Sequence, residues 1–444
     1  MGSFGSRPAV SGVRAITVIV ILLISGSMSL CSEKEVDDEE DSDHDDQWDY
    51  EEEGGNDDRS NDTDNGTGDD DGSDNDDSLT FPHVDIDYVA GIRGLQPTVN
   101  VEARLVSRDE FRLVGGSDMD VWRLDEVQEL LFYTFLWNSS EPGMVESFDH
   151  YFLNSSNGLY HESNGSLYVI QELPEEARGY ILFHEYVHAL QDQHYDLSAF
   201  LDRSTLDRTI SSLSLVEGDA DIFCQAFLEN LNISHLELIA SQLGNLTGHG
   251  EDPPYGFSSV FSSPYDLGYD FVYSLLERNE DFFARMENTY ANPPRTSEQI
   301  LHPEKYLAGE SALPVKRPRA PDDAIMKVNS TIGEFLIRQM FNRYLDVNLS
   351  QRAAEGWGGD SMVIHDLPNG SVRCTWATVW DTDDDAREFD DTLEELALAV
   401  GGTTRWPGVY AYQDVYFKWE RTDSEVTLCF DRYPGELMTW SPDI

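Results

Sequence analysis

The chain is 444 residues long and carries 85 aspartate and glutamate residues against 29 lysine and arginine residues, a formal charge of −56. A surface this acidic repels phosphate, which excludes nucleic acid as a partner. Hydrophobic residues make up 40% of the chain, which excludes global disorder, and 4 cysteines are too few for a fold held together by disulfide bonds.

Residues 1–31 have the pattern of an export signal or a membrane anchor. Arg7 and Arg14 precede an apolar run over residues 15–24, and small residues follow it. Cys31 is a candidate for lipidation, and an uncleaved anchor is the alternative. Ten Asn-x-Ser/Thr sequons further along the chain are typical of a glycoprotein. We therefore expect a protein that is secreted or lies on the outer face of the cell membrane, which it contacts only through this N-terminal anchor.

Residues 32–79 are expected to form a disordered acidic linker. Between residues 33 and 77 there are 24 acidic side chains against Lys34 and Arg59, a net charge of −22, and almost no apolar residues. Such a segment cannot bury enough surface to offset the entropy of ordering it. The residues from 78 onward still carry a net charge of −36, which we interpret as halophilic adaptation, because concentrated salt screens the repulsion.

Two folded regions are expected after the linker, one over residues 80–325 and one over residues 326–444. The hydrophobic periodicity indicates both helices and strands in each region, so the predicted class is α+β. In the first region the expected elements are short strands and turns over 81–116, a helix over 120–137, a hairpin with strands at 158–162 and 166–170, a helix after 174, and a helix over 264–276. In the second region they are helices over 331–344 and 385–400 and strands at 372–380, 415–419 and 426–430.

The cysteines of the folded regions differ in their predicted surroundings. Cys374 and Cys429 fall in two of the strands predicted for the second region. Because cysteines of neighbouring strands can pair in an exported protein, we expect a disulfide bond between them. Cys224 lies in an apolar segment and is expected to remain a free thiol.

The helix predicted after residue 174 carries a candidate metal site. His184 and His188 are four residues apart, so both imidazoles lie on one face of the helix, one turn apart. This spacing lets two nitrogens hold one zinc ion and places Glu185 near the open coordination position as a general base. A salt-bridged surface helix is the alternative interpretation of the same five residues.

Three residues are candidates for a third ligand. His194 lies where the metzincin pattern has its third histidine, but that pattern needs a glycine at the position of Gln191, and on a continuing helix His194 would be rotated by roughly 240°. Glu217 lies in an apolar segment where an unpaired carboxylate would be costly, and Asp219 is the second choice there. Asp221, one turn beyond Glu217, is placed to orient a ligand histidine through its second nitrogen.

His-Glu-x-x-His followed by Glu-Gly-Asp-Ala resembles the gluzincin class of zinc metallopeptidases. The chain is more narrowly similar to a family of uncharacterised secreted or lipid-anchored prokaryotic proteins with the core His-Glu-x-x-His-Ala-Leu-Gln-Asp-Gln-His, including surface proteins of halophiles. The similarity covers most of the chain from residue 82 and includes residues 92–95, 106–110 and 296–306. It implies a zincin-like domain that binds Zn²⁺ through His184, His188 and Glu217, with Glu185 as the base. Asp221 replaces the threonine expected at its position.

The function that this similarity implies is hydrolysis of peptide bonds at the cell surface. Zinc lowers the pKa of a bound water towards ~7, and Glu185 removes its proton as the hydroxide attacks the carbonyl of a peptide or protein substrate. His302, in a polar, Pro-bounded turn, is the candidate second donor to the oxyanion. The alternative is a catalytically inactive surface or binding protein that retains the zincin fold.

Overall fold

The computed structural model describes residues 81–116, 122–247, 252–278, 281–319, 321–401 and 406–442. The predicted signal segment with Cys31 and the predicted acidic linker lie outside these residues. The fold is α+β as predicted, with 54% helix and 16% strand. None of the helices in the described ranges is both long enough and apolar enough to span a membrane.

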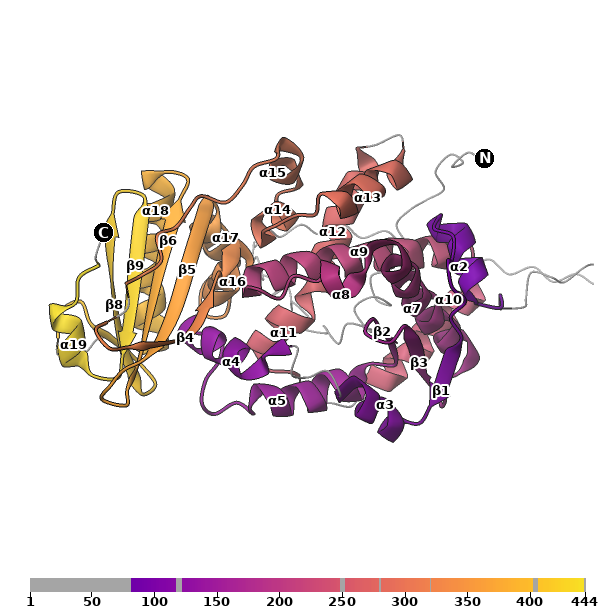
Figure 1. The fold of residues 1–444 in the computed structure, drawn as a ribbon, viewed down its shortest axis with the longest axis horizontal. Coiled ribbons are helices and arrows are strands. Elements are labelled where there is room, and N and C mark those ends of the chain that lie inside the picture. Colours follow the sequence, from indigo (N-terminus) through magenta and orange to yellow (C-terminus); the bar gives the residue numbers. More distant parts are fainter. Residues whose placement is uncertain are drawn as a thin grey trace, which may run out of the picture. The chain divides into compact units, whose positions relative to one another are not determined.

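Helices dominate the chain up to residue 308, and a small sheet lies among them (Figure 1). The helices of this part are α2 (Ile86–Arg93), α3 (Arg108–Gly115), α4 (Leu124–Tyr133), α5 (Met144–Ser147), the π-helix η2 (Phe148–Phe152), α6 (Leu153–Ser155), α7 (Glu175–Tyr195), α8 (Leu197–Phe200), α9 (Leu206–Glu229), α10 (Ile233–Thr247), α11 (Tyr255–Phe261), α12 (Ser263–Glu277), α13 (Phe282–Ala291), α14 (Ser297–Leu301) and α15 (Pro303–Ala308). The strands are β1 (Ala103–Val106), β2 (Gly158–His161) and β3 (Ser166–Ile170), in the order β1-β3-β2.

The predicted hairpin is confirmed, because β2 and β3 pair antiparallel with Tyr160 opposite Leu167. The prediction of strands and turns before residue 116 is wrong for most of that segment, which forms α2 and α3 around the single strand β1. Both helices have capping residues. Asp85 accepts a hydrogen bond from the N–H of Tyr88, and Ser107 forms a capping box with Glu110.

The chain from residue 325 builds a six-stranded antiparallel sheet in the order β4-β5-β6-β9-β8-β7. Its elements are β4 (Ile325–Ser330), α16 (Gly333–Asn342), α17 (Val347–Ala354), β5 (Trp357–Asp366), β6 (Val372–Trp380), α18 (Asp383–Val400), β7 (Tyr410–Tyr412), β8 (Val415–Thr422), β9 (Glu425–Asp431) and α19 (Pro434–Thr439). The predicted helices and strands of this region are all present, whereas β4, β5 and β7 are not among the predicted strands.

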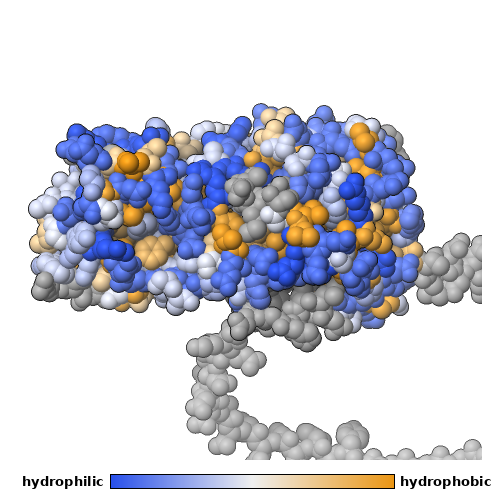
Figure 2. Space-filling model, turned by 60° about the horizontal axis from the view of Figure 1, so that its bottom comes forward, coloured by the Kyte–Doolittle hydropathy of each residue, from blue (hydrophilic) through white to orange (hydrophobic). Residues whose placement is uncertain are grey.

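A large hydrophobic core lies between this sheet and the helices α16 and α18. Trp376 of β6 and Phe389 of α18 are fully buried in it, and Leu130 of α4 and Ile210 of α9 belong to the same cluster. The core therefore crosses the boundary expected at residue 325, while the six-stranded sheet lies wholly after that boundary. The face drawn in Figure 2 is mainly hydrophilic, with hydrophobic residues in separate small patches.

The predicted disulfide bond is wrong, since Cys374 and Cys429 are both free and buried. In the register of β6 and β9, Thr375 is opposite Cys429 and Cys374 is opposite Phe430. Because successive side chains of a strand point to opposite faces, the two thiols lie on opposite faces of the sheet. Cys374 belongs to the large core, and Cys429 packs with Leu437 of α19. Cys224 is free and buried, as predicted.

Two buried carboxylates, Asp207 and Asp360, lie at the start of α16, and the backbone N–H of Asp207 donates to the carbonyl of Thr331 at 3.0 Å, which links the helical part to the chain that forms the sheet. Asp360 of β5 accepts hydrogen bonds from the N–H groups of Ile332 and Gly333, both at 2.9 Å, at the start of α16. Asp207 of α9 accepts one from the N–H of Ser297, at 2.8 Å. Gly333 has a φ of +84°, and a Cβ at this position would lie 1.9 Å from Oδ1 of Asp207, so only glycine fits.

Burial raises the pKa of Asp207 to about 7, and the neighbouring carboxylates of Asp360 and Glu298 act in the same direction. The folded state therefore binds more protons than the unfolded state, whose aspartate pKa is about 3.9. The stability that Asp207 contributes is fully present below the unfolded-state pKa of about 3.9 and is lost as the pH rises through the folded-state pKa of about 7.

We expect Asp207→Asn to be more stable than the wild type at pH 8, because the amide keeps an acceptor for Ser297 without a buried charge. Each unit of pKa shift corresponds to about 1.4 kcal/mol of unfolding free energy. The variant should therefore lose measurably less stability than the wild type between pH 5 and pH 8. Urea unfolding of both proteins at the two pH values measures this, with the exposed Asp87→Asn as the control. An unchanged pH dependence in Asp207→Asn would contradict the expectation.

Candidate metal centre

Helix α7 carries the two motif histidines into the interior of the helical part. It begins after Pro174, with Glu175 and Glu176 in its first turn, where negative charge favours a helix. It packs against β2 and β3 on one side and against α9 and α10 on others. Glu217 lies in α9, so the close packing of α7 and α9 decides whether the three predicted ligands meet.

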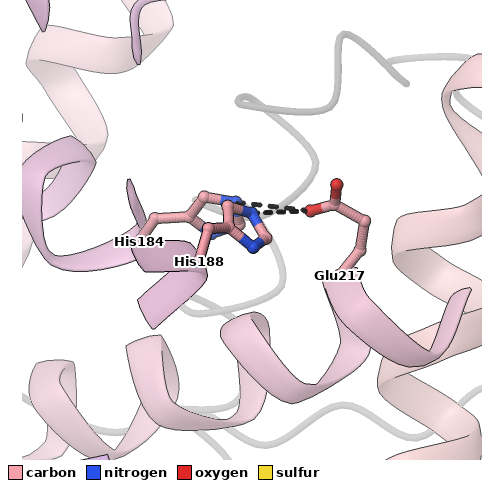
Figure 3. Close-up of side chains that lie close together, drawn as sticks. All are labelled: His184, His188 and Glu217. Carbon is pink, nitrogen blue, oxygen red and sulfur yellow. Dashed lines mark hydrogen bonds and ion pairs between the residues drawn. The ribbon is translucent and has the colours of Figure 1, made fainter. Parts of the chain in front are cut away.

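The three predicted ligands do meet (Figure 3). The Nε2 atoms of His184 and His188 are 3.0 Å apart, and each lies 3.4 Å from Oε2 of Glu217. Ligands held 2.0–2.2 Å from a tetrahedral zinc ion are roughly 3.3–3.6 Å apart, which is close to this spacing. Oε2 of Glu217 is buried and has no hydrogen-bond partner among the described residues, so the donor set fits a cation.

Against the effect of burial, Asp221 raises the pKa of His184 and Glu217 raises the pKa of His188, so metal binding would release protons from the histidines. Burial alone would raise the pKa of Glu217, but His188 and His184 outweigh it and lower this pKa to about 2. Glu217 therefore stays ionised, as a metal ligand must be. Two imidazoles and one carboxylate leave a fourth position of a tetrahedral ion open for water or substrate.

Glu185 lies beside the ligands and is held by strand β2. Its Oε2 accepts a hydrogen bond of 2.6 Å from the backbone N–H of Tyr160. A Cβ at Gly158 would lie 2.7 Å from Oε1 of Glu185 and 2.4 Å from Ile181, so the close approach of β2 to α7 needs a glycine there. Burial raises the pKa of Glu185, while His184 and His188 act in the opposite direction.

The outer nitrogens of the two histidines each have a partner. Nδ1 of His184 lies 3.4 Å from Oδ1 of Asp221 and 3.7 Å from the sulfur of Cys224. Asp221 is therefore positioned to orient the His184 ring through its Nδ1 atom. Nδ1 of His188 lies 2.8 Å from Oε1 of Gln191, a partner that the sequence analysis does not include.

The competing candidates for the third ligand lie elsewhere. Helix α7 continues without a break to Tyr195, so His194 is rotated away and bonds to the backbone carbonyl of Gln96 at 2.8 Å. Asp219 does not belong to the group of His184, His188 and Glu217 and forms an ion pair of 2.8 Å with Arg93.

The prediction that His302 belongs to the site is wrong. His302 lies between α14 and α15, where its Nε2 is 2.8 Å from Oε1 of Glu334 in α16, and it does not line the cavity at the metal centre. The polar, Pro-bounded turn joins α14 to α15. There the His302 ring pairs with a buried carboxylate of α16, which gives it a structural role.

A cavity of about 170 Å³ that opens to solvent is lined by the three ligands and Glu185. Apolar side chains form much of its wall, namely Trp122, Phe148, Phe152, Leu159, Leu197, Leu201, Leu213 and Val216. Among the described residues that line it, Arg203 is the sole lysine or arginine, and its guanidinium lies 3.2 Å from Glu162. The cavity thus places the polar centre beside an apolar wall.

Tyr265 of α12 also lines this cavity and is missing from the predicted site. Its ring lies 6.3 Å from the His184 ring at an interplanar angle of 26°. Burial raises its pKa well above the usual value, and Glu217 adds to the effect, so the hydroxyl keeps its proton and can donate it. The chain has 20 tyrosines, and no spacing in the sequence distinguishes this one.

Comparison with known families gives one match, and it lies outside the metal centre. A family model described as Domain of unknown function (DUF8575) matches residues 324–437. These residues form the six-stranded sheet with its helices, whereas all the ligands precede them. No curated protein and no solved structure matches the chain.

Proposed function

We propose that this protein is a zinc-dependent peptidase of the gluzincin type, with His184, His188 and Glu217 as the zinc ligands. The observation that carries the proposal is the convergence of two imidazole nitrogens on one buried carboxylate oxygen that accepts no hydrogen bond among the described residues, with a second carboxylate, Glu185, beside them. A structural zinc site is closed by four protein ligands, whereas a three-ligand set that opens into a cavity is typical of catalysis.

Zinc held by this set would act as a Lewis acid and make a neighbouring water acidic near neutral pH. Glu185 would take the proton of the attacking water and deliver it to the leaving amine. The N–H of Tyr160 orients the Glu185 carboxylate for this task through its hydrogen bond of 2.6 Å. A raised pKa favours proton uptake by Glu185 during the reaction.

Strand β2 offers a place for an extended substrate. It is an edge strand of the small sheet, and Gly158, Tyr160 and His161 line the cavity. The N–H of Tyr160 points away from β3 towards Glu185, so this side of the strand faces the metal centre. Because the N–H of Tyr160 is already bonded to Glu185, an extended peptide would add through the other outward main-chain groups of β2, while its side chains enter the apolar part of the cavity.

The oxyanion that forms during attack on the carbonyl needs a hydrogen-bond donor, and Tyr265 replaces His302 in this role. We expect Tyr265→Phe to lower kcat by roughly 10²-fold, the usual cost of one such donor, while the zinc content and KM change little. Tyr269→Phe, one turn further along α12 with its hydroxyl bonded to Gln225, is the matched control. Equal kcat for the wild type and Tyr265→Phe would remove Tyr265 from the mechanism.

The proposal is tested with the full-length protein in concentrated salt, which matches the acidic composition. Zinc content is measured by atomic spectroscopy, and cleavage of a broad peptide library by mass spectrometry. We expect about one zinc per chain and cleavage that stops on chelation and returns with zinc. Zinc binding without cleavage of any peptide would favour the alternative, an inactive surface or binding protein with the same fold.

We also propose that the peptidase works outside the cell membrane, either secreted or held by its N-terminal segment. The signal-like pattern of residues 1–31 and the ten sequons support this location. Protease accessibility of the protein on intact cells tests it.

A further inference from the structure

A buried polar network lies behind the metal centre and connects His188 to α2. Nδ1 of His188 is 2.8 Å from Oε1 of Gln191. Nε2 of Gln191 lies 2.9 Å from the backbone carbonyl of Val216 and 2.8 Å from Oδ2 of Asp219. Gln191 and Asp219 are both fully buried, so solvent does not compete for these hydrogen bonds.

The far end of the network is an ion pair. Arg93, at the end of α2, donates to Oδ2 of Asp219 at 2.8 Å, and the hydroxyl of Tyr290 donates to the same oxygen at 2.9 Å. Arg93 is 1% exposed, and its guanidinium lies 4.8 Å from the centre of the Phe223 ring. Since a buried charge is tolerated only with a partner, the two charges hold each other in place.

The contacts determine which end of the Gln191 amide faces His188. A side-chain amide has an NH₂ group that donates and an oxygen that accepts. Two acceptors, the Val216 carbonyl and the Asp219 carboxylate, face one end, so that end is the NH₂ group. The oxygen at the other end accepts only, and Nδ1 of His188 must therefore carry a hydrogen.

A neutral imidazole with its hydrogen on Nδ1 has its lone pair on Nε2. Nε2 is the atom of His188 that lies 3.4 Å from Glu217, at the point where the ligands converge. We propose that Gln191, held by the Arg93–Asp219 ion pair, is a positioning residue that sets the tautomer and ring orientation of His188 for metal binding. This inference rests on the proposed metal site.

Zinc affinity of the full-length protein tests the inference, measured by competition with a chromophoric chelator. Gln191→Met keeps the volume but removes the acceptor, and zinc binding should weaken about 10–100-fold, as for other outer partners of metal ligands. Gln193→Met is the control, because this glutamine of the same helix bonds to Thr98 and lies outside the cavity. Its affinity should equal that of the wild type.

Gln191→Glu separates positioning from a structural role. It keeps an acceptor for the hydrogen on Nδ1 of His188 but puts a second carboxylate next to Asp219. We expect lower thermal stability without metal, yet zinc binding within about tenfold of the wild type. Affinity that falls together with stability in both variants, or wild-type affinity in Gln191→Met, would overturn the inference and leave the zinc site intact.

Cobalt substitution gives a second readout that does not depend on activity. In the Co²⁺-loaded wild type, the hydrogen on Nδ1 of His188 should give a slowly exchanging, shifted proton resonance, because Gln191 protects it. In Gln191→Met this resonance should exchange faster or disappear. A wild type that binds neither metal would overturn both the inference and the proposed function.

Discussion

Replacing Glu185 by glutamine is expected to abolish peptide hydrolysis and to leave the zinc content unchanged. The amide cannot take up the proton of the attacking water, and loss of a general base typically lowers the rate by 10²–10⁴-fold. The amide oxygen can still accept the hydrogen bond from Tyr160, so the local geometry should survive. Initial rates on the best library peptide, together with zinc analysis of the same preparation, measure both effects.

Glu162→Gln is the matched control for this experiment. Glu162 lines the same cavity but pairs with Arg203 rather than with the metal ligands. We expect its variant to keep most of the activity. A Glu185→Gln variant as active as the wild type would place the base elsewhere, and one that loses zinc would make Glu185 a ligand.

The second large effect is expected at the third ligand. Glu217→Ala should lose zinc, because the two histidines alone leave the ion without its carboxylate. The fall in affinity should exceed the 10–100-fold typical of an outer partner. His194→Ala should bind zinc like the wild type. In the wild type, His194 lies on an exposed part of α7, and its ring bonds to the backbone carbonyl of Gln96 rather than to a metal ligand.

Equilibrium dialysis against buffered zinc, with both variants in parallel, compares these affinities directly. Far-UV circular dichroism shows whether each variant keeps its helices. Zinc loss in His194→Ala, with normal zinc binding in Glu217→Ala, would overturn the gluzincin-type assignment.

The parts of the candidate site that could be predicted are those that depend on one helix at a time. A spacing of four residues places His184 and His188 on one face of any helix, whatever surrounds it. Glu217 could be predicted because a carboxylate in an apolar segment needs a partner. A similar reason made several strands predictable, because the alternation of apolar and polar residues is a local pattern. These are the hairpin strands β2 and β3 and the strands β6, β8 and β9.

The strands expected over residues 81–116 failed on a local pattern, whereas the predictions for the disulfide bond and for His302 failed because two distant segments had to be placed relative to one another. Cys374 and Cys429 do lie in neighbouring strands, but a register shifted by one residue puts their thiols on opposite faces. His302 lies in a polar turn, and its partner, Glu334, comes from a helix that follows in the sequence. The local sequence pattern predicts neither the register between two strands nor the helix that supplies the partner of His302.

The sequence by itself determined the donor types, the spacing of the histidines, the strongly negative charge and the α+β class. These follow from composition and from periodicity over a few residues. Only the tertiary structure decided that Tyr265 lines the cavity, that Tyr160 orients Glu185, and that Arg93 and Asp219 hold Gln191 behind His188. The physical reason is that these contacts join segments far apart in the chain, and the packing of α2, α7, α9 and α12 creates them.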